Sequence, residues 1–224
     1  VNNETGEILP VKEISYGVKK KNPKVYFHCD CIQAYGKLSV SLNDIPADFI
    51  TMSAHKIHGP KGCGAIYIRN QIPFKPLCYG GKQESMIRPG TENAAGIVAF
   101  GKAANNALKD MNKNWSYVHK LNQYLRDELH KVNDAVINSP ENALPYVLNV
   151  SLPRLTTEEW LPVFRLNNIC ISGSSACGRG EKSRVIREMG ITGRRADSVL
   201  RIGLSKKNTK EELDILMKII KNVY

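Results

Sequence analysis

Short, almost continuously apolar segments recur along the chain, and they constrain its fold more than any other feature. The segments at residues 24–30, 49–53 and 64–69 read as strands, and loops or helical patterns separate them. Strands that are apolar on both faces are typical of parallel or mixed sheets covered by helices. The sequence therefore predicts an α/β fold.

A long helical pattern divides the chain. Apolar residues recur at helical spacing from about residue 92 to 132, with a break near residues 112–114 left open. We expect this helix to leave a first domain, residues 1–110, and to enter a smaller α/β domain, residues 111–224. In the second domain the pattern predicts strands at 146–152, 169–172 and 199–204, and helices at 157–166, 182–189 and 210–223. Thr209 is a good N-cap for the last helix.

Composition and charge exclude several classes of protein. The 224 residues have 42% hydrophobic content, which excludes intrinsic disorder, and no apolar run is long enough to span a bilayer. Lys and Arg outnumber Asp and Glu by 32 to 21, but no nucleic-acid-binding motif accompanies the net charge of +11. The six cysteines have no spacing typical of a metal site or a disulfide scaffold. We expect a protein of the reducing cytoplasm, with no metal, no membrane contact and no direct nucleic-acid binding.

The densest cluster of polar residues follows the segment at 49–53. Ser53-Ala-His55-Lys56-Ile-His-Gly-Pro-Lys-Gly places a lysine at a strand end, before glycines that allow close backbone approach. A partly desolvated lysine amine can react as a neutral nucleophile, and Ser53 and His55 can donate to a phosphate. Taken alone, the cluster fits a solvated basic loop better than a reactive site.

A carboxylate closes the segment at 24–30. Asp30 ends this strand and Gln33 follows three residues later, at the strand end where α/β sheets place ligand contacts. A carboxylate facing the ring nitrogen of pyridoxal phosphate keeps that nitrogen protonated. A lone Asp after a strand is also common as a turn residue or an N-cap.

Together these motifs resemble the NifS/IscS-type cysteine desulfurases, in the class V aminotransferase group of fold-type I pyridoxal-phosphate enzymes. The resemblance runs in order along essentially the whole chain. It rests on His28-Cys-Asp30-Cys-Ile-Gln33-Ala-Tyr-Gly36-Lys37, the Ser53–Lys61 stretch, Gly80-Gly81-Lys-Gln83-Glu84, Arg88-Pro-Gly90-Thr91-Glu92-Asn93, Leu148-Asn-Val-Ser, Ser172-Gly-Ser-Ser-Ala-Cys177 and Leu200-Arg201-Ile-Gly-Leu-Ser. It implies the C-terminal part of that fold, with part of the mainly parallel sheet of the large domain and a small C-terminal domain.

The resemblance also implies roles for individual residues. Lys56 would bind pyridoxal phosphate covalently, Asp30 would pair with its ring nitrogen, and Gln33 would bind the ring hydroxyl. Ser53 and His55 would hold the phosphate, and Thr91 would reach the cofactor of the other subunit of a homodimer. Asn3 would lie near cofactor and substrate, and Arg201 would clamp the substrate carboxylate, a task suited to guanidinium.

Cys177 decides the activity that the resemblance implies. In the family, the cysteine of the Ser-Ser-Ala-Cys loop takes the sulfur of L-cysteine as a persulfide and leaves L-alanine. Glycines and serines around Cys177 favour an exposed loop, and neighbouring cations favour the reactive thiolate. In a sequence without such neighbours, a cysteine reads as a small buried hydrophobe. We expect a cysteine desulfurase for iron–sulfur cluster or tRNA thiolation pathways, with a sulfur-acceptor or scaffold protein as partner.

The family's N-terminal part is absent from the sequence, which begins at Val1. It would carry a phosphate-binding threonine and the histidine that stacks on the cofactor. We therefore expect a fragment, whose activity in isolation is doubtful. The alternatives are a selenocysteine lyase or aminotransferase with the same cofactor, and an inactive fragment that acts as a scaffold or binding module.

Overall fold

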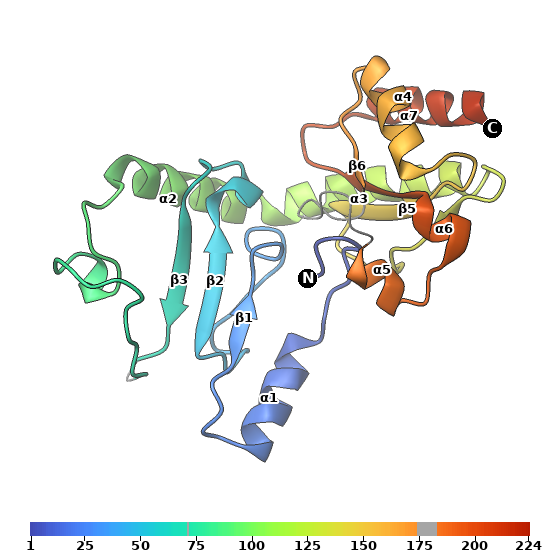
Figure 1. Cartoon of the computed structure of the whole chain (residues 1–224). Helices are drawn as coiled ribbons and strands as arrows, with labels where there is room; N and C mark the ends of the chain where they lie inside the picture. Colours follow the sequence, from blue (N-terminus) through green and yellow to red (C-terminus); the bar gives the residue numbers. More distant parts are fainter. Residues whose placement is uncertain (71, 174–182) are drawn as a thin grey trace. The chain divides into compact units, whose positions relative to one another are not determined.

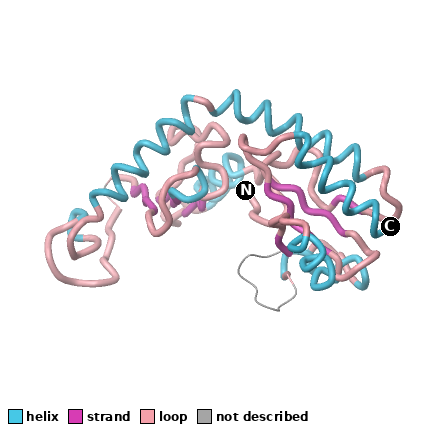
Figure 2. Tube along the Cα trace, turned by 90° about the horizontal axis from the view of Figure 1, so that it is seen from above, coloured by secondary structure: helices cyan, strands magenta, loops and turns pink. Residues whose placement is uncertain are grey.

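The structure, a computed structural model, describes residues 1–70, 72–173 and 183–224 of the chain. These residues divide into two compact units, each with its own sheet (Figure 1). Pro10–Met111 form the three-stranded unit, whereas Val1–Leu9 and Asn112–Tyr224 form the four-stranded unit. Figure 2 shows the strands of the two sheets as separate groups. The predicted division near residue 110 lies beside this boundary, but residues 1–9, expected in the first domain, group with the four-stranded unit.

The three-stranded unit contains a mixed sheet of order β1-β2-β3. β1 and β2 are parallel, with Asp30 opposite Thr51, and β3 runs antiparallel to β2. The short apolar segments of the sequence thus form strands as predicted, although β1 is confined to the last three residues of its segment. The elements are α1 (Val11–Lys21), β1 (His28–Asp30), β2 (Phe49–Ser53), the 3-10 helix η1 (Ala54–Ile57), β3 (Gly64–Ile68), the 3-10 helix η2 (Glu84–Met86) and α2 (Ala94–Lys109).

Asp48 anchors α1 to the start of the parallel strand pair. Its Oδ2 accepts hydrogen bonds from Lys19 Nζ at 2.5 Å and from the backbone N–H of Phe27 at 2.6 Å. Burial of Asp48 opposes its ionisation, but these donors together lower the pKa of its carboxyl below the usual range. A single carboxylate therefore links helix, loop and sheet in this unit.

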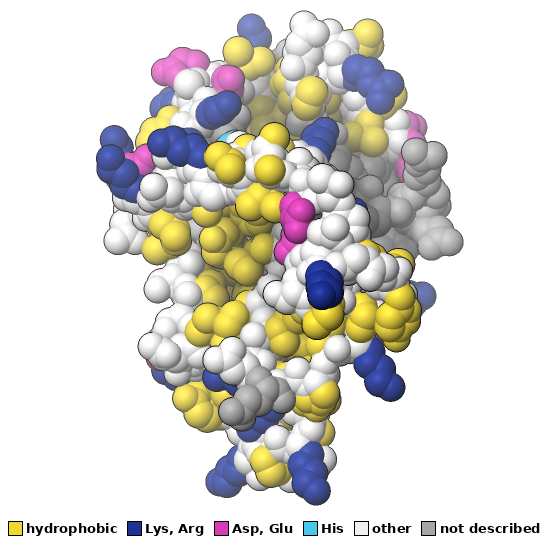
Figure 3. All heavy atoms as spheres, turned by 90° about the vertical axis from the view of Figure 1, so that its left-hand side faces the viewer, with side chains coloured by type: hydrophobic (Ala, Val, Ile, Leu, Met, Phe, Trp, Pro, Cys, Tyr) yellow, Lys and Arg dark blue, Asp and Glu magenta, His cyan; other side chains and the backbone are white. Residues whose placement is uncertain are grey.

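Large apolar side chains remain exposed on the three-stranded unit. Leu77 is 97% exposed, Tyr79 is 81% exposed, and Val98 in helix α2 is 72% exposed. Figure 3 shows hydrophobic side chains gathered on one face of the molecule. Exposed apolar surface of this kind is typical of a region that meets another chain or another segment.

The four-stranded unit contains an antiparallel sheet of order β4-β5-β7-β6. Every residue of the inner strand β5 is buried. The predicted N-cap Thr209 forms a capping box before α7, and a second capping box, which the sequence analysis does not predict, forms at Thr156 before α4. The elements are α3 (Met111–Leu129), β4 (Val136–Ile137), β5 (Val147–Ser151), α4 (Thr157–Leu166), β6 (Ser172–Gly173), α5 (Arg184–Glu188), α6 (Gly193–Asp197), β7 (Val199–Gly203) and α7 (Lys210–Val223).

Helices α3 and α7 pack side by side in this unit. Tyr117 donates its hydroxyl to the carbonyl of Asn208 at 2.7 Å, and Lys221 Nζ lies 2.7 Å from a carboxylate oxygen of Glu128. Beneath these polar contacts the helices bury one apolar face each, as their spacing predicts. The buried side chains are Val118, Leu121, Leu125 and Leu129 of α3 and Leu213, Leu216, Met217 and Ile220 of α7.

The helical pattern at 92–132 forms two helices instead of one. α2 ends at Lys109, where Asp110 adopts φ −102° and ψ 8° as C-cap, and α3 begins at the next residue. The break therefore lies earlier than residues 112–114. Among the described residues, no helix combines the length and apolar character needed to cross a bilayer.

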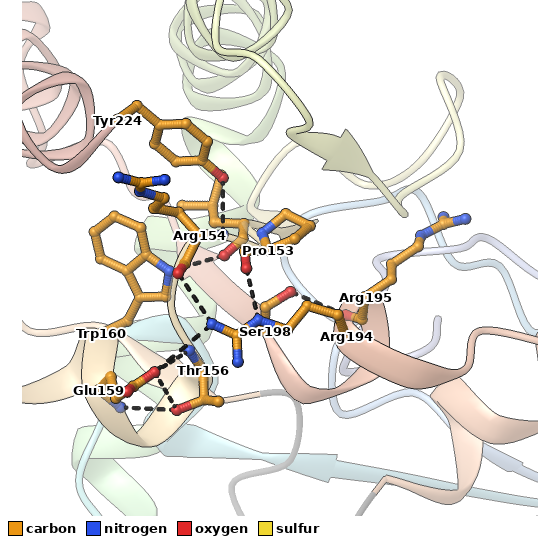
Figure 4. Close-up of polar contacts among 10 residues, drawn as sticks. Pro153, Arg154, Thr156, Glu159, Trp160, Arg194, Arg195, Ser198 and Tyr224 are labelled. Atoms are coloured by element: carbon orange, nitrogen blue, oxygen red, sulfur yellow. Dashed lines mark hydrogen bonds and ion pairs between the residues drawn. The ribbon is translucent and has the colours of Figure 1, made fainter.

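Trp160 is one of the largest side chains in the core of the four-stranded unit. Its ring is fully buried, stacks on Phe164 at 5.3 Å and lies 6.4 Å from the ring of Tyr224. The indole Nε1 donates to the carbonyl of Leu152, just past the end of β5, at 2.9 Å. Figure 4 shows how Arg194 secures the same stretch of chain.

Arg194 binds the backbone that follows β5. Its Nε donates to the carbonyl of Pro153 at 2.7 Å and its Nη2 to the carbonyl of Arg154 at 3.0 Å, while Glu159 lies 3.9 Å away (Figure 4). The carbonyls of residues 152–154 thus each meet a side-chain donor. We infer that this turn is fixed by side chains where the regular sheet hydrogen bonds end.

Replacing Trp160 by Phe should destabilise the chain by about 1–3 kcal/mol, because the buried carbonyl of Leu152 loses its donor. Urea unfolding followed by circular dichroism measures the change. Trp115→Phe is the matched control, since it removes the same N–H from the half-buried ring that stacks on His119. Equal stability of the two variants would contradict the assigned role of the indole hydrogen bond.

Candidate functional site

The predicted lysine lies on a tight turn at the end of β2. Ser53, still in an extended conformation, ends the strand, and His55 and Lys56 follow in η1. Ser53 Oγ and His55 Nδ1 share a hydrogen bond of 2.7 Å. His55 is exposed and Lys56 is half-buried. The turn therefore brings together a hydroxyl, an imidazole and an amine at one strand end.

Backbone contacts make this turn rigid. The N–H of Gly59 donates to the carbonyl of Ala54 at 2.9 Å, and His58 closes the turn in the left-handed conformation with φ 63°. A Cβ on Gly59 would lie 2.9 Å from the carbonyl of Ala54 and 3.2 Å from the side chain of Ala103 in α2. Glycine is thus required where helix α2 and the turn approach each other.

Asp30 lies at the equivalent end of the neighbouring parallel strand. Its Oδ1 accepts a hydrogen bond from the backbone N–H of Ile32 at 2.8 Å, which holds the carboxylate in a fixed orientation. Cys29 and Cys31 are buried in the core on either side of it, whereas Asp30 is exposed. Because side chains alternate along a strand, Asp30 points away from that core. The carboxylate and the lysine turn therefore follow adjacent strand ends.

The two buried thiols beside Asp30 contact each other. Cys29 Sγ and Cys31 Sγ lie 3.5 Å apart, and Ala47 and Ile50 belong to the same apolar cluster. The hydrogen bond with Cys29 and the burial raise the pKa of the Cys31 thiol, which keeps it protonated. Burial in this cluster gives both cysteines a structural role.

Gln33 and Lys37 complete the group in the three-stranded unit. Lys37 Nζ donates to Gln33 Oε1 at 3.4 Å, and both side chains are half-buried. Burial and the charge of Lys56 lower the pKa of Lys37 to about 8. Sequence reasoning assigns no role to Lys37. The only signal is its place four residues after Gln33, in the same turn.

Thr91 is exposed just before α2. Asn93, the N-cap of this helix, accepts a hydrogen bond from the N–H of Gly96 at 3.0 Å and lies 3.5 Å from Cys63 Sγ. These contacts tie the start of α2 to the residues that precede β3. The segment of Thr91 is thus held in the same unit as Lys56, while the contact of Thr91 with a cofactor stays a prediction.

The remaining described residues of the predicted site lie in the four-stranded unit. Arg201 in β7 donates through Nη1 to the carbonyl of Asn3 at 3.3 Å. The preceding residue shapes the turn, because Asn2 Oδ1 accepts hydrogen bonds from the N–H groups of Glu4 at 2.8 Å and Thr5 at 3.0 Å. Asn3 and Arg201, expected to bind the same substrate, are therefore neighbours.

A buried polar cluster fixes the segment that carries Asn3. Glu4 is 6% exposed, and its carboxylate accepts a hydrogen bond from Ser183 Oγ at 2.6 Å. Asn149 Nδ2 donates to the carbonyl of Glu4 at 3.2 Å, and Ser139 Oγ donates to the carbonyl of Thr5 at 2.6 Å. The first residues of the chain are thus held by three distant parts of this unit.

Cys177 lies outside the described residues, within 174–182. On one flank Ser172 pairs with Arg201 and Gly173 pairs with Leu200 in the sheet. On the other flank Ser183 caps α5 and donates to Glu4. The described residues on both flanks therefore contact Arg201 or Glu4, next to the residues expected to bind substrate. Among the described residues, no group of three or more His, Cys, Asp and Glu side chains is placed to hold a metal ion.

The chain matches known proteins over nearly its whole length. Residues 1–216 match the family model described as aminotransferase class-V. The cysteine desulfurase IscS of Clostridium botulinum is 36% identical over 99% of this chain and 57% of its own length. The mitochondrial cysteine desulfurase of Saccharomyces cerevisiae is 36% identical over 98% of the chain and 44% of its length. The chain thus spans about half the length of these relatives.

Comparison with solved structures gives the same result as comparison of sequences. A NifS-like protein superposes with a TM-score of 0.92 at 36% identity, over 99% of this chain and 58% of that one. The NifS-like protein of Rickettsia africae gives a TM-score of 0.90 at 30% identity, over 100% of this chain and 60% of its own. The fold is therefore that of part of a fold-type I pyridoxal-phosphate enzyme, as the motifs predict. By sequence and by fold, the chain belongs to the aminotransferase class-V family.

Proposed function

We propose that the chain supplies the cofactor-holding and sulfur-carrying residues of a pyridoxal-phosphate-dependent cysteine desulfurase. The observation that carries the proposal is the placement of Lys56, Ser53 and His55 on one turn, beside the strand that ends in Asp30. Enzymes of the family use pyridoxal phosphate, and the donor set fits that group. It offers an amine for the aldehyde, a hydroxyl and an imidazole for the phosphate, and a carboxylate for the ring nitrogen.

The residues of the three-stranded unit bind and orient the cofactor. Lys56 is the point of covalent attachment, Ser53 and His55 bind the phosphate, and Gln33 binds the ring hydroxyl. Asp30 keeps the ring nitrogen protonated, and its hydrogen bond from Ile32 holds the carboxylate ready for that contact. When bound, pyridoxal phosphate supplies an electron sink for the bonds at the substrate's α-carbon.

The residues of the four-stranded unit bind the substrate and receive the sulfur. The guanidinium of Arg201 binds the carboxylate of L-cysteine, with Asn3 beside it. The thiolate of Cys177 attacks the sulfur atom of the substrate, and a new S–S bond forms as the C–S bond breaks. The electron pair of the C–S bond stays with the β-carbon, which takes up a proton, and the product that leaves is L-alanine. A selenocysteine lyase, an aminotransferase or an inactive scaffold is less favoured, because the similar proteins are named cysteine desulfurases.

The assembly that we propose is a homodimer in which Thr91 reaches the cofactor of the second subunit. The exposed apolar side chains of the three-stranded unit, such as Leu77 and Val98, support an assembly with further protein surface. Sulfur passes from Cys177 to an acceptor or scaffold protein. The cytoplasmic location stays a prediction, since relatives include bacterial and mitochondrial enzymes.

Lys56→Ala should abolish covalent attachment of pyridoxal phosphate. After incubation with the cofactor and reduction with cyanoborohydride, the unaltered chain should gain one cofactor mass, located on the peptide that contains Lys56. Lys61→Ala, an exposed lysine five residues away, is the control and should keep the label. A label that persists in Lys56→Ala, or that lies on other lysines, would show that the turn is not the cofactor site.

Asp30→Asn should weaken binding of pyridoxal phosphate by about ten- to a hundredfold, the value of a lost charge-assisted hydrogen bond. Asn keeps an acceptor for the N–H of Ile32, so the local turn should stay intact. Quenching of protein fluorescence during titration with the cofactor measures the affinity. Asp44→Asn, which removes an exposed carboxylate paired with Lys12, should leave the affinity unchanged.

Cys177→Ala should eliminate the persulfide and leave cofactor attachment at Lys56 intact. The chain, reconstituted with cofactor, is incubated with L-cysteine and a persulfide-selective alkylating tag, and its peptides are then weighed. Cys78→Ala, which removes an exposed free thiol, is the matched control and should keep the tagged Cys177. Persulfide on another cysteine of Cys177→Ala would assign the sulfur-carrying role elsewhere.

A further inference from the structure

Two thiols meet in the core of the three-stranded unit, next to the carboxylate of the proposed cofactor site. Cys29 is 9% exposed and Cys31 is 3% exposed, and their Sγ atoms lie 3.5 Å apart. Asp30, the residue between them, is exposed and points away from that core. Any reaction that joins the two sulfur atoms therefore acts directly on the residue that carries the carboxylate.

The contact between the sulfur atoms gives the two cysteines different chemistry. A hydrogen bond from the Cys31 thiol stabilises negative charge on Cys29 and lowers the pKa of the Cys29 thiol to about 7, although burial and the charge of Asp30 oppose this change. Cys31 stays protonated, because the same hydrogen bond and its burial raise the pKa of its thiol. The pair thus combines a sulfur that can react as a thiolate with a protonated thiol in contact with it. Among the described residues no third side chain completes a metal site around them.

We propose that Cys29 and Cys31 are a site of reversible oxidation, at which hydrogen peroxide converts the two thiols into a disulfide. The Cys29 thiolate attacks one oxygen of the peroxide, the O–O bond breaks, and the other oxygen leaves as hydroxide, which takes up a proton to become water. The Cys31 sulfur then attacks the sulfenic acid on Cys29. The S–S bond forms as the S–O bond breaks, and the hydroxyl group leaves with the Cys31 proton as a second water. Peroxide is small enough to reach sulfur atoms that are nearly buried, whereas a bulky oxidant is not.

The disulfide displaces the strand end that carries Asp30. Residues two apart in a strand are separated by about 6.6 Å, near the upper limit of the Cα separations that disulfides span. The sulfur atoms must approach from 3.5 Å to about 2 Å, so the backbone between them must shorten. Two hydrogen bonds hold this backbone: Cys31 N–H donates to the carbonyl of Thr51 at 3.0 Å, and Ile32 N–H donates to Asp30 Oδ1 at 2.8 Å. Their loss releases the carboxylate from the orientation in which it would meet the cofactor, a consequence that rests on the proposed function.

Peptide mapping tests the thiol pair without any cofactor. The reduced chain is treated with hydrogen peroxide, unfolded in urea, blocked with N-ethylmaleimide and digested with trypsin, which releases residues 25–37 with Cys29 and Cys31 as their only cysteines. This peptide should be lighter by two hydrogens and carry no maleimide, and dithiothreitol should restore two thiols that react. Cys78, an exposed free thiol, is the internal control. It should still react with maleimide at a peroxide dose that oxidises the pair.

Single variants assign the roles of the two sulfur atoms. In Cys31→Ala, Cys29 should stop at the sulfenic acid, which dimedone traps, whereas in Cys29→Ala the thiol of Cys31 should resist peroxide. Circular dichroism verifies that each variant folds, and the mapping of the unaltered chain needs no variant. A pair that keeps two maleimides when Cys78 is already oxidised, or a Cys31 that reacts faster than Cys29, would overturn the proposal.

Two further measurements follow the effect on Asp30. By NMR, the amide of Ile32 should exchange with solvent about tenfold faster in the disulfide form, because its hydrogen bond to Asp30 is lost. The oxidised chain should also bind pyridoxal phosphate about tenfold more weakly than the reduced chain, and dithiothreitol should restore the affinity. Cys29→Ala, treated with peroxide in the same way, should keep its affinity.

The two readouts separate this proposal from the proposed function. Unchanged exchange of the Ile32 amide in a chain that has formed the disulfide would show that oxidation does not reach Asp30. Equal cofactor affinity of the oxidised and reduced chains would contradict the link to the site. If neither form binds the cofactor, the proposed function is wrong, and amide exchange and peptide mapping still decide whether the thiol pair acts as proposed.

Discussion

The close approach of α2 to the turn η1 is the constraint on which the candidate site depends. Gly36 lies against Ile57 and Ala107, and Gly59 lies against Ala103, so that neither position has room for a side chain. Any larger residue at either glycine would push the turn away from the helix, and Lys56 with it. Rigid support of this kind is what a reacting amine needs, since small displacements of a reacting group are costly. Helix and turn therefore act together as the base of the site.

In the four-stranded unit, the N-terminal segment is irregular and is held in place although it forms no strand. The unit's buried polar groups replace a sheet ladder: Glu4, Asn149 and Ser139 each meet a partner within hydrogen-bond distance. Among the described residues, no buried side-chain nitrogen or oxygen is left without one. A fully satisfied network of this kind defines one conformation, because each misplaced member would bury an unpaired polar group. The backbone carbonyl of Asn3 is thereby held beside Arg201.

Much of the fold and part of the candidate site could be predicted from local sequence. The helices at 157–166 and 210–223 begin and end where their caps and apolar spacing indicate, because those signals are local. The sequence places residues 1–9 in the first domain, because their hydrogen-bond partners are more than a hundred positions away and leave no signal in the neighbouring sequence. The place of Lys37 is another example, because it depends on the packing of Gly36 against Ile57, twenty-one positions later. The motifs around Asp30 and Lys56 were found because strand ends are visible in the sequence, whereas Cys177 lies outside the described residues.

The order in which the chain can fold follows from the hydrogen bonds of its first residues. Glu4 bonds with Ser183, 179 positions later, and with Asn149, 145 positions later. Such contacts close very long loops, and they form slowly because the entropy of the intervening chain is lost first. Pro10–Met111, in contrast, are continuous in sequence. During synthesis the three-stranded unit can therefore gain structure before the segment of Glu4, whose partner Ser183 is made much later.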